Sequence, residues 1–524
     1  MKKLLIAMML GGVTVVASAQ YTFDVLQYST EELRGTSRFM SMAGSMGGLG
    51  GDLSAINVNP GGIGIYRSSD VSVTPSLEFL KSTVNGTDFT RTRVQLNQVG
   101  YAGALRINSD VMPYFNWAVS YNRKYSARRR YAGGAKGIPT SITNYLADWA
   151  TSTTVPASDL STNSYNSSTG ADWNQILAYN NNLMIETGNA DYSGLGVEGT
   201  YGENEFEVEE WGHSDEYNLT FGGNIRNKVY WGIGFTYAEM EYKAYKYYGE
   251  VLTNTVIYKD AARSAGMDGD AAFGFSDGMR TVGDGFKFKA GVIYKPVNEL
   301  RLGLAFHTPT WFKMKDTYTT TVSAAFYDGN TELYTKEGST PTNSVWYTYN
   351  TPWHFVGSMG IVAGKSGLIN LEYECVANST MRIGDEDFNN YPDATDEIKD
   401  YLQASHTVRV GGEYRVSKDV SLRAGYSYQT SPVKQEVRED KVDVIVSGSC
   451  PAYSFDKSVQ YITAGLGYHH GGFYADLAYV YKKRDGEYRS VPANYAFQNN
   501  PLPALGAGLK DSNSRISLTL GLRF

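Results

Sequence analysis

The sequence predicts an all-β protein, a fourteen-stranded antiparallel transmembrane β-barrel with an N-terminal hatch and short helices in its extracellular loops. Three features lead to this fold class. The last strand alternates strictly and ends on an aromatic residue, the chain begins with a secretory leader, and alternating segments recur in pairs joined by short turns. Together they favour a secreted chain that closes its sheet within a membrane.

The C-terminal segment has one apolar face, made of Ile516, Leu518, Leu520, Leu522 and Phe524. The residues between them are polar or small, so a strand here has one dry face and one wet face. A soluble sandwich strand alternates in the same way. A position at the very end of the chain, with a terminal aromatic residue, is typical of the closing strand of an outer-membrane barrel. We therefore expect the barrel-assembly machinery to recognise the C-terminal strand that ends in Phe524.

The N-terminal segment has the composition of a signal peptide. Lys2 and Lys3 precede the apolar residues 4–16, and Ala17-Ser18-Ala19 forms a small-x-small cleavage site before Gln20. Thirteen apolar residues are too few to cross about 30 Å of hydrocarbon as a helix. Removal of residues 1–19 leaves 524 − 19 = 505 residues and changes the formal charge from −7 to −9, because two lysines are lost. No later segment is long and apolar enough for a helical span, so membrane insertion requires a closed barrel.

Pairs of alternating segments lie between these two ends. Ten such segments form five pairs. In two pairs both segments are clear: residues 217–225 with 229–237, and residues 286–294 with 300–308. In the other three pairs, residues 353–361, 406–415 and 460–468 are each followed by a short turn (364–367, 416–419 and 469–472) and then by a second segment. Residues 70–80, 92–107, 114–124 and 514–524 bring the predicted total to fourteen. An even number puts both termini on the periplasmic side, with the short turns. The long connections, residues 125–212, 243–283 and 309–351, then lie outside.

The first long connection contains two helical patterns. Residues 140–150 place Ile142, Tyr145, Leu146 and Trp149 on one face. Residues 172–186 do the same for Trp173, Ile176, Leu177, Leu183 and Met184, with Asp172 as an N-cap. The two apolar helix faces either pack on each other as a lid or line an apolar ligand groove. The two interpretations can both be correct. The predicted groove consists of Ile142, Leu146, Trp149, Trp173, Ile176 and Leu177.

The segment before the first strand does not alternate. Residues 34–52 and 55–64 are rich in glycine and other small residues. A phosphate-binding loop needs a strand before it and a helix after it, and neither is predicted here. Glycine does permit the close backbone approach that a segment threaded into a lumen requires. We therefore expect three parts: signal peptide 1–19, hatch 20–69 and barrel 70–524.

Several motifs, in order along the chain, resemble one family. They are NPGGI (59–63), KP (295–296) followed by LRLGLAF (300–306), VRVGGEY (408–414), LRAGYSY (422–428) with Ser431-Pro432, and FYADLAY (473–479). The chain resembles the FadL outer-membrane transporters for long-chain fatty acids and their toluene- and xylene-uptake relatives. The resemblance covers nearly the whole mature chain.

This resemblance implies a barrel blocked by a hatch in the outer membrane of a Gram-negative bacterium. A hydrophobic molecule would land in a groove at the extracellular loops, pass to a deeper pocket and leave sideways through a gap in the wall. Asn59, Pro60, Gly61 and Gly62 match the gating motif of the hatch, although the family's usual alanine is Gly61 here. Uptake would be passive, through a monomer that contacts outer-membrane lipid and lipopolysaccharide and needs no cofactor.

Other functions are also compatible with parts of the sequence. A passive porin would have the same strands and a lumen lined by charged side chains. The charged residues predicted to face inward would either line such a water-filled lumen or pair with a hatch. They are Lys287, Lys289, Arg301, Arg409, Glu413, Arg415 and Arg423. Glycines are predicted at several lumenal positions: Gly232, Gly234, Gly303, Gly411 and Gly425. They either make room for a hatch or a ligand, or they only allow the sheet to coil.

A haemin receptor would need axial ligands from the six histidines, His213, His307, His354, His406, His469 and His470. Haemin binding is the weaker alternative. An energy-coupled receptor needs about twenty-two strands, for which this chain is too short.

The remaining residues give few signs of other chemistry. No nucleophile motif such as G-x-S-x-G is present, so we expect no enzyme. The acidic residues 268–277 and 385–400 do not have EF-hand spacing, and no metal site is expected. The acidic balance argues against nucleic acid. Cys375 and Cys450 either form one bridge or stay as two thiols.

Overall fold

A computed structural model describes residues 22–107, 109–161, 165, 171–258, 266–364, 366–444, 451–494 and 502–524. The predicted signal peptide and Cys450 lie outside these ranges. Cys375 is half-buried and faces outward, on the same side of its strand as Tyr373. Among the described residues, no helix is both long and apolar enough to cross a membrane.

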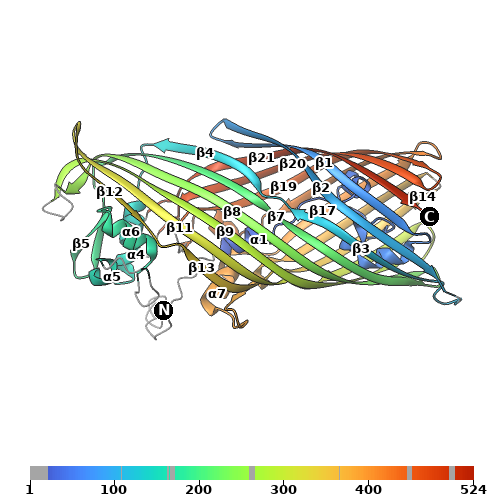
Figure 1. The fold of residues 1–524 in the computed structure, drawn as a ribbon. Helices are drawn as coiled ribbons and strands as arrows, with labels where there is room; N and C mark the ends of the chain where they lie inside the picture. The colour runs from blue at the N-terminus through green and yellow to red at the C-terminus, as the bar shows by residue number, and fades with distance from the viewer. Residues whose placement is uncertain are drawn as a thin grey trace.

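The described chain forms a closed antiparallel barrel (Figure 1). The wall has fourteen strands: β1 (Asp70–Val84), β2 (Thr87–Arg106), β3 (Tyr114–Tyr125), β7 (Tyr201–Ile225), β8 (Val229–Tyr258), β9 (Gly266–Tyr294), β10 (Leu300–His307), β14 (Trp353–Ala363), β15 (Gly367–Ala377), β17 (Ser405–Arg415), β18 (Val420–Thr430), β19 (Tyr453–His470), β20 (Phe473–Val491) and β21 (Leu505–Arg523). Each pairs with the next, and β21 pairs back with β1, for example Val73 with Leu520. The predicted fold class is confirmed.

Rings on the outer face mark the membrane-facing band. Near the end that carries the short turns and the C-terminus, here the turn end, Tyr101 lies 5.2 Å from Trp117 and 6.5 Å from Phe524 between ring centroids. A second belt crosses the neighbouring strands β3, β7, β8 and β9 through Tyr121, Tyr217, Tyr237 and Phe286, with neighbouring centroids 5.2–6.1 Å apart. Aliphatic side chains lie between the two belts. On β9 the band covers the nine residues from Phe286 to Tyr294, the length expected of a tilted membrane strand.

Beyond the second belt the wall continues far from the membrane band. β7, β8 and β9 contain 25, 30 and 29 residues. They are joined by β4 (Arg128–Lys136), β11 (Trp311–Asp328), β12 (Thr331–Ser339), β13 (Asn343–Asn350) and β16 (Arg382–Gly384). The predicted external connections 243–283 and 309–351 were therefore wrong, because most of their residues are strand. Their alternation is inverted: Tyr242 and Tyr248 are buried inside, whereas Lys243 and Glu241 face out.

The lumen is filled by the segment before β1. It contains α1 (Thr22–Tyr28), α2 (Ser37–Ser41), α3 (Ala55–Val58) and the 3-10 helix η3 (Pro60–Ile65). Wall glycines allow its close approach. A Cβ atom at Gly232 would lie 2.1 Å from the Pro60 oxygen, and one at Gly411 or Gly425 would lie 2.5 Å from backbone atoms of Met42. The glycines thus make room for the hatch.

The opposite end of the barrel, here the lid end, carries a small helical lid at the left of Figure 1. It contains α4 (Ile142–Ser152), α5 (Ala157–Ser161), α6 (Trp173–Asn180) and the hairpin of β5 (Met184–Gly188) and β6 (Asp191–Gly194). Asp172 caps α6 as predicted, in a capping box with Gln175. The helix predicted to reach residue 186 ends at Asn180, since Asn182 adopts a left-handed φ of 58° and Met184 starts β5. The short elements η4 (Asn378–Thr380), α7 (Pro392–Tyr401) and α8 (Gln435–Arg438) lie between wall strands.

Candidate functional site

The N-terminal helix α1 occupies an aromatic chamber inside the barrel. Phe23, Val25 and Tyr28 are buried there. The ring of Phe23 stacks on Tyr453 at 4.3 Å and lies 6.2 Å from Tyr401. The wall of this N-terminal chamber includes Tyr242, Phe312, Met314, Tyr347, Tyr349, Met381, Ile398, Val433 and Phe455. The chain thus fills its own most aromatic lumenal space with a piece of itself.

Only a few polar contacts hold α1 in place. The Tyr349 hydroxyl donates to the Val25 carbonyl oxygen over 2.9 Å, and the hydroxyls of Tyr28 and Thr281 lie 3.0 Å apart. The Gln27 amide also donates to the Tyr125 hydroxyl, and the Asp24 carboxyl group interacts with Lys246. The side chains of Phe23 and Val25 themselves make only apolar contacts, so an apolar ligand could take their place in the chamber.

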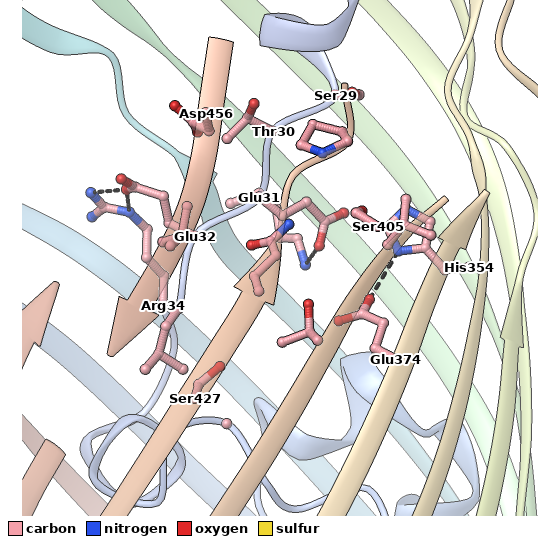
Figure 2. Close-up of a pocket in the computed structure, with 18 of the residues that line it drawn as sticks. Ser29, Thr30, Glu31, Glu32, Arg34, His354, Glu374, Ser405, Ser427 and Asp456 are labelled. Atoms are coloured by element: carbon pink, nitrogen blue, oxygen red, sulfur yellow. Dashed lines mark hydrogen bonds and ion pairs between the residues drawn. The ribbon is translucent and has the colours of Figure 1, made fainter. Parts of the chain in front are cut away.

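A smaller cavity of about 160 Å³ lies beside the chain that follows α1. Figure 2 shows Glu31, His354 and Glu374 pointing into it, with Ser405 and Ser427 on neighbouring wall strands. His354 Nδ1 lies 3.0 Å from Glu374 Oε1. Its lining is mixed, because apolar side chains such as Phe23, Leu33 and Val459 lie among the charged ones.

Haem does not fit this cavity. Pockets for ligands of that size occupy about 300–1,000 Å³. His307, the other histidine on the lining, has its Nε2 atom 2.8 Å from the Val58 oxygen. With α1 docked, this cavity therefore gives no support to the haemin alternative.

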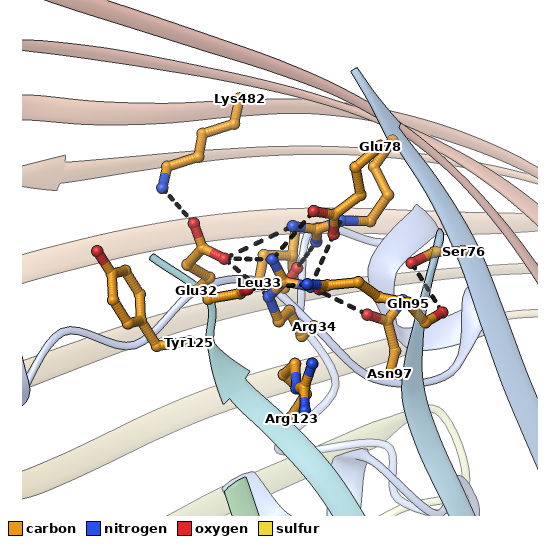
Figure 3. A network of polar contacts seen from close by, with 12 residues as sticks. Glu32, Leu33, Arg34, Ser76, Glu78, Gln95, Asn97, Arg123, Tyr125 and Lys482 are labelled. Carbon is orange, nitrogen blue, oxygen red and sulfur yellow. Dashed lines mark hydrogen bonds and ion pairs between the residues drawn. The ribbon is translucent and has the colours of Figure 1, made fainter. Parts of the chain in front are cut away.

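Residues 29–36, here called the strap, connect α1 to the rest of the hatch and are held by buried ion pairs (Figure 3). Glu32 pairs with Lys482 at 2.7 Å and with Arg34 at 2.6 Å. Arg34 pairs with Glu78 of β1 at 2.7 Å, and neither of these two side chains is accessible to solvent. Removing one partner of such a pair leaves an uncompensated buried charge, at a cost of about 3–5 kcal/mol.

The Arg34 guanidinium also reaches an irregular part of the wall. It donates to Gln95 Oε1 over 2.9 Å and to Asn97 Oδ1 over 3.1 Å. Asn97 is the extra residue of a bulge, because Thr74 pairs with Gln98 and Pro75 with Leu96. The bulge turns Asn97 and Gln98 both into the lumen, where they are buried.

Backbone pairing between β2 and β3 stops at this bulge, with Gln98 opposite Asn122. In the described chain, residues 91–97 of β2 have no backbone partner on that side. We call this stretch the seam. It is closed by side chains: Arg93 and Gln95 both donate to the Ser126 hydroxyl, over 2.7 and 2.9 Å. On the outer face, Val94 is 75% exposed and Leu96 is 41% exposed.

The predicted gating residues lie where the hatch meets β8 and β9. The Asn59 amide donates to the Gly47 oxygen over 2.7 Å and to the Val292 oxygen over 3.2 Å. A Cβ atom at Gly61 would lie 2.9 Å from the Val292 Cα atom. Gly62 packs on Gly50, whose φ is +61°. Glycine at position 61 thus suits a backbone approach too close for the alanine that the family usually has there.

The six predicted groove residues lie together in the lid. Ile142, Leu146, Ile176 and Leu177 are buried in one cluster with the inner face of the wall extension, and Trp149 packs at its edge. Trp173 lies 5.6 Å from Tyr318 of β11. In this closed arrangement these side chains are covered by the wall, as the lid interpretation expects, so a groove along them would require the lid to open.

The inward charged residues mostly contact the hatch or one another. Arg38 pairs with Glu413 at 3.0 Å, Lys287 with Glu31 at 3.4 Å, and Arg301 donates to the Leu49 oxygen over 2.9 Å. Sequence reasoning missed α1 and the strap as functional parts. The signal available was local: Phe23, Val25 and Tyr28 precede the charged run Glu31-Glu32 and Arg34, within a segment otherwise interpreted by its glycines.

Comparisons with known proteins found a family model and several solved structures to which this chain is similar. The family model "Outer membrane protein transport protein (OMPP1/FadL/TodX)" matches residues 176–471, more than half of the chain. No curated protein matches the sequence. Among solved structures, a FadL homologue of Pseudomonas aeruginosa has 13% identity and a TM-score of 0.49, covering 94% of this chain and 99% of its own.

Two toluene transporters also match. TodX of Pseudomonas putida has 12% identity and a TM-score of 0.44, and TbuX of Ralstonia pickettii has 10% identity and 0.43, each with coverage of 94% of this chain and 99% of its own. The sequence match to the family model shows that this chain belongs to the outer membrane transport family OMPP1/FadL/TodX.

Proposed function

We propose that this protein is a passive, hatch-gated channel that admits hydrophobic small molecules such as long-chain fatty acids or aromatic hydrocarbons. The observation that carries the proposal is the N-terminal chamber, which α1 fills with Phe23 and Val25. In this scheme α1 is a removable occupant. The substrate competes with it for the same aromatic walls.

Competition solves the problem of release. A fatty-acid chain gains about 0.8 kcal/mol per buried methylene, so an empty apolar chamber would hold its ligand too tightly to pass it on. If α1 must leave before the ligand binds, the energy of ligand burial is partly offset by the lost packing of Phe23. Return of α1 then expels the ligand, and the step runs down the substrate gradient without an energy source.

The seam is the proposed exit. It opens toward the outer face beside Val94 and Leu96, which a lipid chain can contact, while Arg34 closes it from the lumen. Movement of α1 pulls on the strap and withdraws Arg34 from Gln95 and Asn97. The substrate would leave sideways at the outer edge of the membrane band, where the seam begins, because the hatch below fills the lumen.

The remaining assignments complete the proposal. Residues 1–19 are a cleaved signal peptide, residues 20–69 the hatch domain and residues 70–524 the barrel domain. The turn end faces the periplasm, the lid end faces outward, and Phe524 is the signal for barrel assembly. The protein acts as a monomer in the outer membrane of a Gram-negative bacterium. The gate consists of Asn59, Pro60, Gly61 and Gly62. Once the lid opens, the substrate first binds to the groove residues Ile142, Leu146, Trp149, Trp173, Ile176 and Leu177.

Native mass spectrometry of the detergent-purified barrel tests this function. We expect a co-purified fatty acid or aromatic hydrocarbon, with bound mass reduced in a Tyr453→Ala variant that removes a chamber wall. Steady ion conduction by the wild-type barrel in a planar bilayer, without bound ligand, would instead support a porin. Bound haem would support the haemin receptor.

A further inference from the structure

The wall extension carries two outward-facing lysines directly beyond the aromatic belt. Trp311 of β11 belongs to the belt, since it is opposite Phe286 in register and its ring also lies 6.0 Å from Phe288. Lys313 and Lys315 follow on the same face of β11, because side chains alternate along a strand. At about 3.3 Å per residue and a strand tilt of about 40°, they lie roughly 5 and 10 Å above the belt. This is the level of lipid headgroups.

These two lysines differ from other outward cations near this level. Arg91, Lys81 and Lys483 each pair with a carboxylate, Glu209, Asp88 and Asp485 respectively. In the part of the chain that the structure describes, neither Lys313 nor Lys315 forms an ion pair, and Asp284, the register partner of Lys313, does not pair with it. Positive charge is therefore left uncompensated at this place.

The neighbouring strands add to it. Arg280 of β9 is 58% exposed at its side chain and shares a single carboxylate, Glu241, with Lys243 of β8. Two cations against one acid leave one further positive charge on the same face. The other acids on this face are Glu239 and Asp284, which are opposite each other in register. With Glu241 included, four cations therefore face three carboxylates.

An exposed indole lies between the two lysines. Trp346 of β13 is opposite Lys315 in register and is 43% exposed. The Lys313 and Lys315 ammonium groups lie 5.5 and 5.4 Å from the centre of its ring. Cation–π contacts of this length hold both ammonium groups beside one ring. A flat aromatic face beside two fixed cations suits a sugar that carries phosphate.

We propose that Lys313, Lys315 and Trp346 form a docking surface for the phosphorylated disaccharide headgroup of lipopolysaccharide in the outer leaflet. The phosphate contacts the two ammonium groups, a sugar ring lies against Trp346, and the acyl chains run down over Trp311, Phe286 and Phe288. Charge complementarity and height above the belt select this occupant. Inorganic phosphate lacks the chains, and a phosphatidylglycerol headgroup lacks the sugar pair.

Binding of lipid A to the full barrel in nanodiscs, counted by native mass spectrometry, tests the proposal. The probes are bisphosphorylated lipid A, dephosphorylated lipid A, phosphatidylglycerol and inorganic phosphate. A basic residue near an anionic surface contributes about fivefold in affinity, so the K313Q/K315Q double variant should bind bisphosphorylated lipid A about thirty-fold more weakly. W346L should lose several-fold while keeping both charges.

The matched control is K81Q/K483Q, which removes two exposed outward lysines that already have acidic partners. We expect it to bind lipid A as the wild type does. Equal binding by K313Q/K315Q and wild type, or equal binding of dephosphorylated lipid A or phosphatidylglycerol, would overturn the proposal. Retained hydrophobic ligand in the same spectra reports separately on the chamber, so the two proposals can fail independently.

Discussion

Truncation of Phe23 to alanine should increase the affinity of the chamber for hydrophobic ligands. Phe23 is 5% exposed and stacks on Tyr453 and Tyr401. Phe→Ala changes at buried positions cost about 3–5 kcal/mol. If the lower value falls entirely on docking of α1, the docked state loses about 150-fold in population relative to the undocked state. A ligand that competes with α1 gains up to the same factor.

Titration of purified barrels with a fluorescent fatty acid measures the effect. The control is Phe388→Ala, which truncates a phenylalanine that is 60% exposed and does not belong to the chamber cluster. Unchanged or weaker ligand binding in the Phe23→Ala variant, with thermal stability of the barrel unchanged, would refute the idea that α1 occupies the ligand's place. The strap pairs of Glu32 and Arg34 keep the rest of the hatch attached, so lumenal blockage should persist.

Further outcomes follow from the hatch, the seam and the lid. Arg34→Ala leaves Glu78 with two cations, Arg93 and Arg515, in place of three, and it removes the contacts to Gln95 and Asn97. Ligand release into detergent micelles should therefore speed up about tenfold or more. The control variant Arg67→Ala, at an exposed position, should release ligand at the wild-type rate. Gly232→Ala places a Cβ atom 2.1 Å from the Pro60 oxygen and should displace the hatch and raise bilayer conductance, while Gly508→Ala, which meets no atom within 4 Å, should not. Burial raises the pKa of Asp148 in α4 from 3.8 to about 7, and a raised carboxyl pKa means that the closed lid favours the protonated acid. Lid stability is then greatest below about pH 4 and falls as the pH rises to 7, so protease cleavage of the lid should be faster at pH 8.5 than at pH 5.5. Asp148→Asn should reduce that difference but not remove it, because the buried carboxyl group of Glu250 also contacts the lid, at Ser141 and Ile142. A pH-independent wild-type lid would contradict this.

The sequence by itself determined the membrane part of this outer-membrane transport protein. Because lipid contacts the outer face of every membrane strand, that face must be apolar, and apolar residues therefore occur at every second position. Ile516, Leu518 and Leu520 are an example. The short turns, the even strand number and the glycine-rich hatch follow from equally local patterns. Even Asp172 could be assigned as a cap, because a capping box needs only neighbouring residues.

Only the tertiary structure decided what fills the barrel. The wall extension was missed because water lies outside it and the lid inside, which reverses the polarity that marks a membrane strand. The chamber, the strap and the seam depend on contacts such as Phe23 with Tyr453, Arg34 with Glu78 and Arg515 with Glu78. These residues are separated by tens to hundreds of positions, so no local pattern encodes their meeting. Closure of the barrel brings them together, and with them the proposed gate.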